Sequence, residues 1–195
     1  MPRLLIYTWP YALFFWAVFV WAFFPEFRII SRTKEPYTSP QDRNSKALIA
    51  FGQGIAIFAA FSIAASMPSA TVPHRVWSFC AGLVTIIAGS LLRRHCWRML
   101  GKSFTGAVIV RTDQAVVQDG AYRYVRHPSY TAGMIMFLGI GLALGNWISL
   151  TVLIAAVVIV YGYRVAVEER ALAAVIGDPY RDYMRRTKRF VPFVF

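Results

Sequence analysis

The feature that most constrains this chain is a series of long apolar segments separated by clusters of basic residues. A helix needs about 17–25 residues to cross a bilayer, and five segments reach that length: 4–24, 47–66, 76–92, 129–145 and 147–163. Of the 195 residues, 57% are hydrophobic and 15% are charged, which is too apolar for an ordinary soluble domain. The sequence therefore predicts an all-α integral membrane protein with five transmembrane helices.

The boundaries of these segments predict how the helices are connected. The last two are separated by little more than Asn146, so we expect a tight C-terminal helical hairpin. The fifth helix is expected to continue beyond the bilayer to about residue 176, because Gly177 suits the position after a helix end and Pro179 stops the helix. The first segment lacks a signal-peptide cleavage pattern, so we expect a retained helix with Pro10 as a possible kink.

The distribution of basic residues predicts the orientation in the membrane. Nineteen of the 21 Lys and Arg residues lie in 25–46, 93–128 and 164–195, and the other two are Arg3 and Arg75. Positive charge collects on the cytoplasmic side of membrane proteins, so we expect the N-terminus outside and the C-terminus in the cytoplasm. The net charge of +12 is then a topology signal that also favours anionic lipids, and we expect no nucleic-acid partner.

The remaining sequence features indicate a single domain. We find no internal repeat, and we interpret 1–195 as a single membrane domain, with a three-helix part (1–96) and a core (97–195). Two cysteines do not suggest a disulfide framework, and no second ligand pair accompanies His95 and Cys96, so no metal site is expected. The sequence does not indicate an oligomeric state.

Polar residues at the two ends of the hairpin predict the location of a site. Arg126 and His127 precede the fourth segment, and Arg164, Glu168 and Glu169 follow the fifth. A hairpin returns to the face from which it started, and packed helices lie about 8–10 Å apart. One ligand can therefore contact both clusters at the cytoplasmic end of the membrane domain.

The chemistry of the two clusters is complementary. A helix start with Pro128 in its first turn, beside Arg126 and His127, favours a carboxylate or a phosphate. Glu168 and Glu169 favour a cation or sugar hydroxyls. S-adenosylmethionine has an anionic end, a cationic centre and a ribose, whereas NADPH requires more positive charge around its phosphates.

Simpler interpretations of the same residues stay open at this point. Arg126 and His127 are also ordinary topology anchors at a cytoplasmic helix start. Arg164 and Glu168 have the spacing of a surface ion pair, although Arg before Glu is the weaker orientation. Three tyrosines near the fourth segment also suit an interfacial aromatic belt: Tyr122, Tyr124 and Tyr130.

An ordered set of residues over roughly 97–195 resembles the isoprenylcysteine carboxyl methyltransferase family, which is related to membrane phospholipid methyltransferases. The first part of the family pattern, G-x-Y-x-x-x-R-H-P-x-Y-x-G, matches Gly120, Tyr122, Arg126, His127, Pro128 and Tyr130. After the hairpin, R-x-x-x-E-E-x-x-L and F-G-x-x-Y-x-x-Y match Arg164, Glu168, Glu169, Leu172, Gly177, Tyr180 and Tyr183. The chain departs from the pattern at Ala121, at Ile176, and at Ala132, where the glycine falls one place later.

The resemblance implies a cytoplasmic pocket for S-adenosylmethionine and assigns roles by position. The implied cofactor contacts are Gln114, Ala115, Val116, Val117, Tyr122, His127, Pro128, Ser129, Tyr130 and Glu168, with Glu169 in support. Arg164 falls where the family holds its methyl-accepting substrate. Arg164, Glu168 and Arg126 are the expected catalytic residues.

The implied reaction is transfer of a methyl group to a lipid-linked acceptor, in first place the carboxylate of an isoprenylcysteine-like substrate. A carboxylate needs no base, so positioning by Arg164 is the main requirement. The alternatives are N-methylation of a phospholipid headgroup, with a glutamate as base, an NADPH-dependent reductase of the sterol type, and a membrane scaffold without activity. Reductases of that type are usually longer and have more membrane spans, so five spans count against this alternative.

Overall fold

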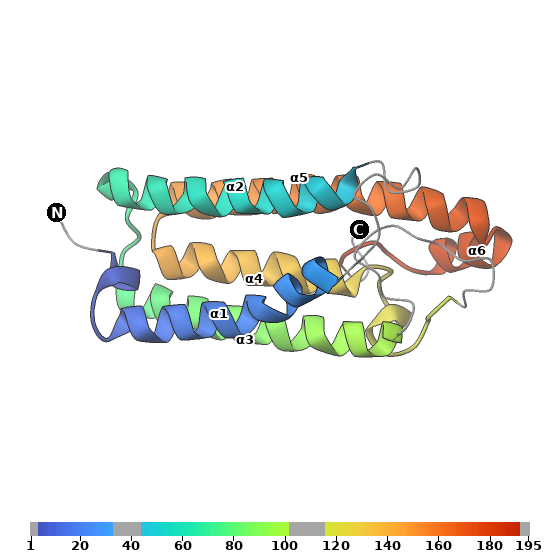
Figure 1. The fold of residues 1–195 in the computed structure, drawn as a ribbon, viewed down its shortest axis with the longest axis horizontal. Coiled ribbons are helices and arrows are strands. Elements are labelled where there is room, and N and C mark those ends of the chain that lie inside the picture. The colour runs from blue at the N-terminus through green and yellow to red at the C-terminus, as the bar shows by residue number, and fades with distance from the viewer. Residues whose placement is uncertain (1–3, 33–43, 102–115, 192–195) are drawn as a thin grey trace.

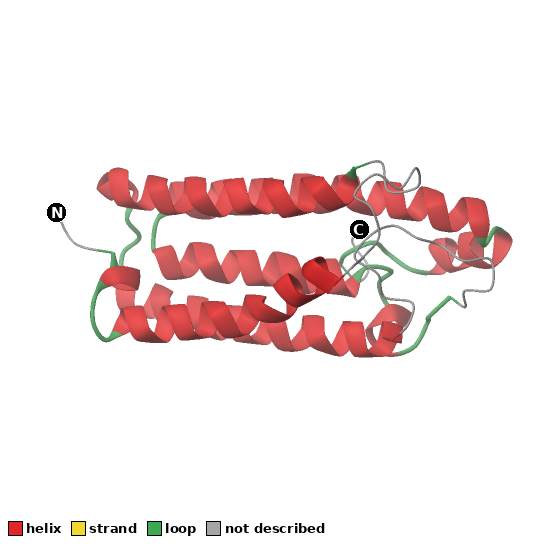
Figure 2. Cartoon of the chain, viewed as in Figure 1, coloured by secondary structure: helices red, strands yellow, loops and turns green. Residues whose placement is uncertain are grey.

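The structure is a computed structural model that describes residues 4–32, 44–101 and 116–191. Its described residues are helical or irregular, with no strand drawn among them (Figure 2). Six α-helices are accompanied by short 3-10 turns in the described part of the chain. The α-helices are α1 (Tyr11–Arg32), α2 (Ser45–Ser66), α3 (Arg75–Leu100), α4 (Pro128–Leu144), α5 (Trp147–Val175) and α6 (Asp178–Arg186). The 3-10 turns are η1 (Leu5–Tyr7), η2 (Pro68–Ala70) and η4 (Gly120–Arg123).

The first five helices lie side by side along one long axis, with α4 in the middle (Figure 1). Helix α4 packs against α3 on one side and α5 on the other, while α2 covers α5 and α1 covers α3. Helix α5 extends past the end of the other four, and α6 folds back against this extension (Figure 1). The end of the bundle near α6 is therefore the end where α4 begins and α5 finishes.

Close contact between α3 and α4 depends on glycine. A Cβ added at Gly82 would lie 2.5 Å from the backbone nitrogen of Ala143, and one at Gly139 would lie 2.7 Å from that of Ile86. Lipid provides no hydrophobic drive for helix association, so close backbone packing supplies much of the attraction. These glycines fix the C-terminal half of α4 against the N-terminal half of α3.

Three helices are long and apolar enough to cross a membrane: α2, α3 and α5. The apolar part of α1 (Tyr11–Glu26) and the 17-residue α4 are shorter. These helices agree with a multi-pass membrane protein, whereas the count of five crossings stays a prediction. The predicted kink is in the wrong place, because Pro10 precedes α1 and the proline inside that helix is Pro25.

The predicted hairpin of α4 and α5 is confirmed. Gly145 takes the left-handed conformation (φ 63°) that ends α4, which glycine adopts without steric cost. The Asn146 side chain accepts a hydrogen bond from the Ser149 backbone N–H at 3.0 Å, and its amide donates to the Met67 carbonyl at 2.9 Å. Helix α5 ends at Val175, before Gly177 (φ 76°), so its predicted extension is also confirmed.

Candidate active site

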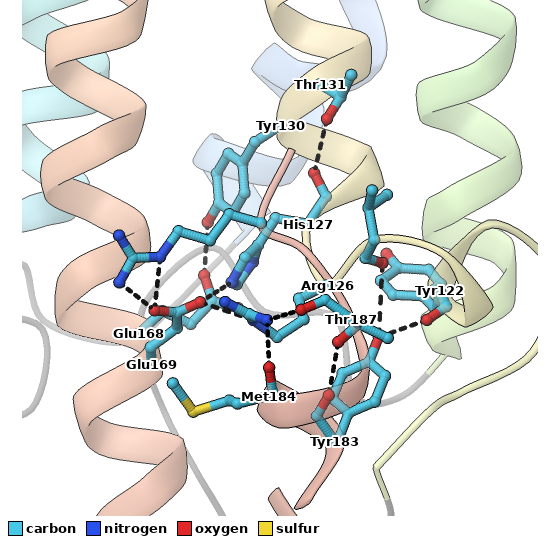
Figure 3. A network of polar contacts seen from close by, with 12 residues as sticks. Tyr122, Arg126, His127, Tyr130, Thr131, Glu168, Glu169, Tyr183, Met184 and Thr187 are labelled. Atoms are coloured by element: carbon cyan, nitrogen blue, oxygen red, sulfur yellow. Dashed lines mark hydrogen bonds and ion pairs between the residues drawn. The ribbon is translucent and has the colours of Figure 1, made fainter. Parts of the chain in front are cut away.

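The hairpin brings together the two polar clusters that the sequence placed at its ends. The Tyr130 hydroxyl at the start of α4 donates to Glu168 Oε2 on α5 at 2.8 Å, across 38 residues of sequence. Arg126 Nε donates to Glu169 Oε1 at 2.9 Å, across 43 residues. Both clusters lie at the α6 end of the bundle (Figure 3).

Glu169 is the centre of a buried ion-pair cluster. Its side chain is 4% exposed and faces three basic side chains. Arg126 Nε lies 2.9 Å from Oε1, His127 Nε2 lies 3.3 Å from the same oxygen, and Arg189 Nη2 lies 2.8 Å from Oε2. A buried carboxylate requires such partners, so the charge of Glu169 is matched by charges of the protein itself.

Arg126 also fixes the segment that follows α6. Its Nη1 donates to the Met184 carbonyl at 2.9 Å and to the Thr187 carbonyl (Figure 3). Residues 187–191 then run beside the start of α4, and we refer to them as the strap. The backbone N–H groups of Arg126 and His127 donate to the carbonyls of Lys188 and Arg189, at 2.7 and 3.0 Å.

The strap changes the environment that the sequence suggested for the start of α4. The sequence predicted a helix start that favours an anion, and in the structure His127 and Ser129 in this first turn are buried. The Thr131 hydroxyl donates to the Phe190 carbonyl at 2.7 Å, so the strap covers the first turn. The helix start therefore faces the interior of the site.

Glu168 belongs to a separate network. Arg164 Nε donates to the Tyr130 hydroxyl oxygen at 3.2 Å, and its Nη1 donates to the Ser45 hydroxyl at 2.5 Å. Arg164 is only 3% exposed. The Tyr130 hydroxyl thus lies between Arg164 and Glu168, and Arg164 is a buried cation among α2, α4 and α5 rather than half of a surface pair.

Three further tyrosines enclose the site beside Glu168. Burial raises the pKa of Tyr122, Tyr180 and Tyr183, and the Glu168 carboxylate adds to the effect on the first two. Tyr183 reaches a pKa of about 12, and its hydroxyl donates to the Tyr122 carbonyl at 2.6 Å. The Tyr122 hydroxyl is buried without a hydrogen-bond partner in the described part of the chain. A buried polar group of this kind is costly unless something bonds to it.

Most of the predicted site residues lie in this region. Those joined by side-chain contacts are Arg126, His127, Tyr130, Arg164, Glu168 and Glu169, with Tyr122 adjacent. Pro128 and Ser129 form the first turn of α4, and Val116 and Val117 are half-buried residues before η4. Gln114 and Ala115 lie outside the described residues.

Sequence reasoning missed Ser45 and Arg189. Ser45 precedes the apolar segment at 47–66 and carries no motif, but it is the first residue of α2 and is buried. Arg189 stood in a basic cluster interpreted as a topology signal. No pattern in the sequence distinguished it from its neighbours, because its role depends on the path of the strap.

The fold and the site define a multi-pass membrane protein with a buried polar site at one end of a helical hairpin. The model of the "Isoprenylcysteine carboxyl methyltransferase (ICMT) family" matches residues 82–174. Over that region the chain is similar in sequence to this family, which confirms the resemblance drawn from its motifs. The matched region starts earlier than expected, within α3, and ends before α6.

Curated relatives have the same family name. Protein-S-isoprenylcysteine O-methyltransferase B from Arabidopsis thaliana is 33% identical over 60% of this chain and 61% of its own length. The relative from Schizosaccharomyces pombe is 32% identical over 54% of this chain and 46% of its own length. The relative from Rattus norvegicus is 30% identical over 60% of this chain and 42% of its own length. The matched region thus spans about half the length of these relatives.

A solved structure has the same fold. It is described as the eukaryotic intramembrane Ras methyltransferase ICMT, and it matches 98% of this chain and 70% of its own chain with a TM-score of 0.70. The sequence identity is 22%. The likeness therefore extends to the N-terminal helices, where no sequence motif was found.

Proposed function

We propose that this protein is an S-adenosylmethionine-dependent membrane methyltransferase that acts on a lipid-linked acceptor, preferably the carboxylate of an isoprenylcysteine-like substrate. The observation that carries the proposal is the chain of contacts from Glu168 through the Tyr130 hydroxyl to the buried Arg164. It places an acidic and a basic side chain a few ångströms apart on one face of the hairpin. The match to the family model and the names of the relatives support the methyl-transfer reaction.

The residues present suit S-adenosylmethionine. Glu168 lies near Tyr122, Tyr130 and Tyr180, and a carboxylate with aromatic rings favours a sulfonium cation. The buried Tyr122 hydroxyl has no hydrogen-bond partner among the described residues and suits a polar group of the cofactor. When bound, the cofactor supplies an electrophilic methyl group on a positively charged sulfur.

Arg164 holds the acceptor in this proposal. A guanidinium matches the planar geometry of a carboxylate, and burial among three helices removes competing water. Because a carboxylate oxygen is already a nucleophile, the protein mainly has to orient it. If the acceptor is instead the amine of a phospholipid, one proton has to leave, and Glu168 is the nearest base.

The same proposal includes the arrangement in the membrane. Five crossings, with α1 and α4 counted, put residue 4 outside and α6, the strap and the site at the cytoplasmic face. Residues 1–195 then form one membrane domain, with 1–96 supporting a methyltransferase core at 97–195. The hydrocarbon chain of the acceptor enters between helices from the bilayer, so a soluble acceptor without a chain is turned over poorly.

Calorimetric titration of the detergent-purified protein with S-adenosylhomocysteine and, separately, with NADPH tests the cofactor class. We expect binding of the first and none of the second. Methyl transfer to a prenylcysteine and to an aminophospholipid then separates the two acceptor classes. Binding of NADPH alone would assign the protein to the reductases, and binding of neither by folded protein would favour a scaffold.

A further inference from the structure

A second buried polar cluster lies on the α3 side of α4, away from Arg164. Its centre is Arg93 on α3, which is 8% exposed. Arg93 Nε lies 2.7 Å from Glu26 Oε1 on α1, and Arg93 Nη1 donates to the Ser129 carbonyl at 2.5 Å. One guanidinium thus joins α1, α3 and the first turn of α4.

A buried ion pair in a membrane helix bundle is costly to maintain for packing alone. Replacement of such pairs by apolar side chains is often neutral or stabilising, and ionisable residues inside membrane segments commonly have a function. Arg93 is well compensated, because its guanidinium lies 5.1 Å from the ring centre of Trp97 and 5.9 Å from that of Tyr161. The pair is therefore a fixed element of the fold.

The surface of α4 is shaped to let Arg93 reach Ser129. A Cβ added at Gly133 would lie 2.8 Å from Arg93 Nη1 and closer still to the Tyr161 hydroxyl. Any side chain at Gly133 would displace both groups. Gly133 follows the position where the family pattern has its glycine, and Ala132 at that position is fully buried, with its carbonyl toward Gly89 on α3. The shifted glycine thus makes room for Arg93.

We propose that Arg93, oriented by Glu26, is a positioning residue that fixes the first turn of α4 and thereby the groups of the site on that turn. Ser129 lies between His127, which contacts Glu169, and Tyr130, which contacts Glu168. Through Glu26, α1 then contributes to the geometry of the site, although this helix precedes the region that matches the family model. The effect on cofactor affinity rests on the function proposed above.

The neighbouring Arg94 provides a matched control. It also ties α3 to α1, through a hydrogen bond from Nη2 to the Trp21 carbonyl at 2.5 Å and a position 4.4 Å from the Trp21 ring centre. Its Nε donates to Ser90 on its own helix at 3.2 Å. Arg94 thus shares the link between α3 and α1 with Arg93, but it lacks the ion pair with Glu26 and the contact with Ser129 of α4.

The test compares Arg93→Lys with Arg94→Lys in lipid nanodiscs. Lysine keeps a positive charge beside Glu26 but has no planar fork to bridge a carboxylate and a carbonyl. We expect Arg93→Lys to weaken S-adenosylhomocysteine binding about tenfold, the size of one hydrogen bond from a charged group. It should also speed amide hydrogen exchange in residues 126–134, whereas Arg94→Lys should stay within about twofold of wild type in both measurements.

Two further controls keep the result decisive. If Arg93→Lys does not fold, the charge-balanced double variant Glu26→Gln/Arg93→Met replaces it and should show the same changes. Equal effects of the Arg93 and Arg94 changes on exchange and on affinity, or no effect of either, would overturn the positioning role. If the wild-type protein does not bind S-adenosylhomocysteine, the proposed function fails, and the exchange comparison alone decides whether Arg93 positions α4.

Discussion

Glu168 and Glu169 are neighbours in sequence, yet they belong to two different networks at the end of α5. Successive residues of an α-helix point about 100° apart, so one glutamate faces Arg126 and the strap while the other faces Tyr130. Glu169 has three basic partners and is 3% exposed. Glu168 is less buried and accepts from a tyrosine hydroxyl that is shared with Arg164.

From this difference we expect a structural role for Glu169 and a ligand-binding role for Glu168. The Glu169 cluster joins the start of α4, the end of α5 and the strap through charges that neutralise one another. The Glu168 network places a carboxylate and the Arg164 guanidinium close together. They lie next to a buried hydroxyl of Tyr122 that lacks a hydrogen-bond partner in the described part of the chain. Changes on the Glu169 side should therefore affect stability, and changes on the Glu168 side should affect ligand binding.

The largest expected effect is that of Glu169→Gln on stability. The change leaves Arg126 and His127 buried beside a neutral amide, and removal of one partner from a buried ion pair costs about 3 kcal/mol or more. Thermal and denaturant unfolding in detergent, followed by tryptophan fluorescence, should show this loss. An unfolding curve that overlays the wild-type curve would mean that the cluster does not hold the strap in place.

Glu168→Gln is the matched change one residue away, and its effect should appear in binding. Loss of a carboxylate that faces a cationic ligand is expected to weaken S-adenosylhomocysteine or S-adenosylmethionine binding by about 10–100-fold. Its unfolding curve should stay close to that of the wild type, because the Tyr130 hydroxyl can still donate to the amide oxygen. Calorimetry on both glutamine variants side by side checks the comparison, which fails if Glu169→Gln has the larger effect on affinity in folded protein.

Tyr183→Phe should have a smaller effect that depends on pH. Burial raises the pKa of Tyr183 to about 12, so the unfolded chain releases this proton more readily than the folded one. The stability that this tyrosine contributes is present below about pH 10 and is lost as the pH rises toward 12. At neutral pH the variant should lose about 1 kcal/mol, from the hydrogen bond to the Tyr122 carbonyl, and its stability should then fall less steeply between about pH 10 and about pH 12. Melting curves across that range test this, and parallel slopes would contradict it.

The smallest effect is expected for Arg189→Ala. Arg189 contacts Glu169, but its side chain is 49% exposed, and exposed partners contribute about 0–1 kcal/mol. Arg126 and His127 remain to neutralise Glu169 in this variant. The same unfolding assay should place it near wild type, and a loss as large as that of Glu169→Gln would show that the strap depends on Arg189.

The sequence predicted the helices well because the signals were local. The positions of the helices follow from apolar runs bounded by basic residues. Their ends follow from neighbouring residues, such as Asn146 between two apolar runs and Gly177 before Pro179. Motif spacing and the geometry of a hairpin also predicted that the polar residues at its two ends lie together, as the structure shows, whereas their roles stay predictions. The family motif gave Glu169 only a supporting part at the cofactor, and it contains no sign that Arg126 donates to Glu169 and to two backbone carbonyls.

What the sequence could not predict depends on contacts between distant segments. Arg93 looked like the polar boundary of a membrane span, because its partner Glu26 lies 67 residues earlier and carries no motif. The burial of the start of α4 depends on the path of the strap, which hydrophobic periodicity does not determine. A surface ion pair stayed an open interpretation of Arg164 because its contact with Ser45, 119 residues away, cannot be inferred from spacing.

The strap also implies an order of events during synthesis. Residues 187–191 leave the ribosome after all the membrane helices have been made, so the hairpin of α4 and α5 enters the bilayer before its charged end is covered. Until the strap arrives, Arg126 and His127 have Glu169 as a partner while their backbone N–H groups face water. A nascent chain stopped before the strap should therefore be inserted in the bilayer and yet lack the cover over the first turn of α4.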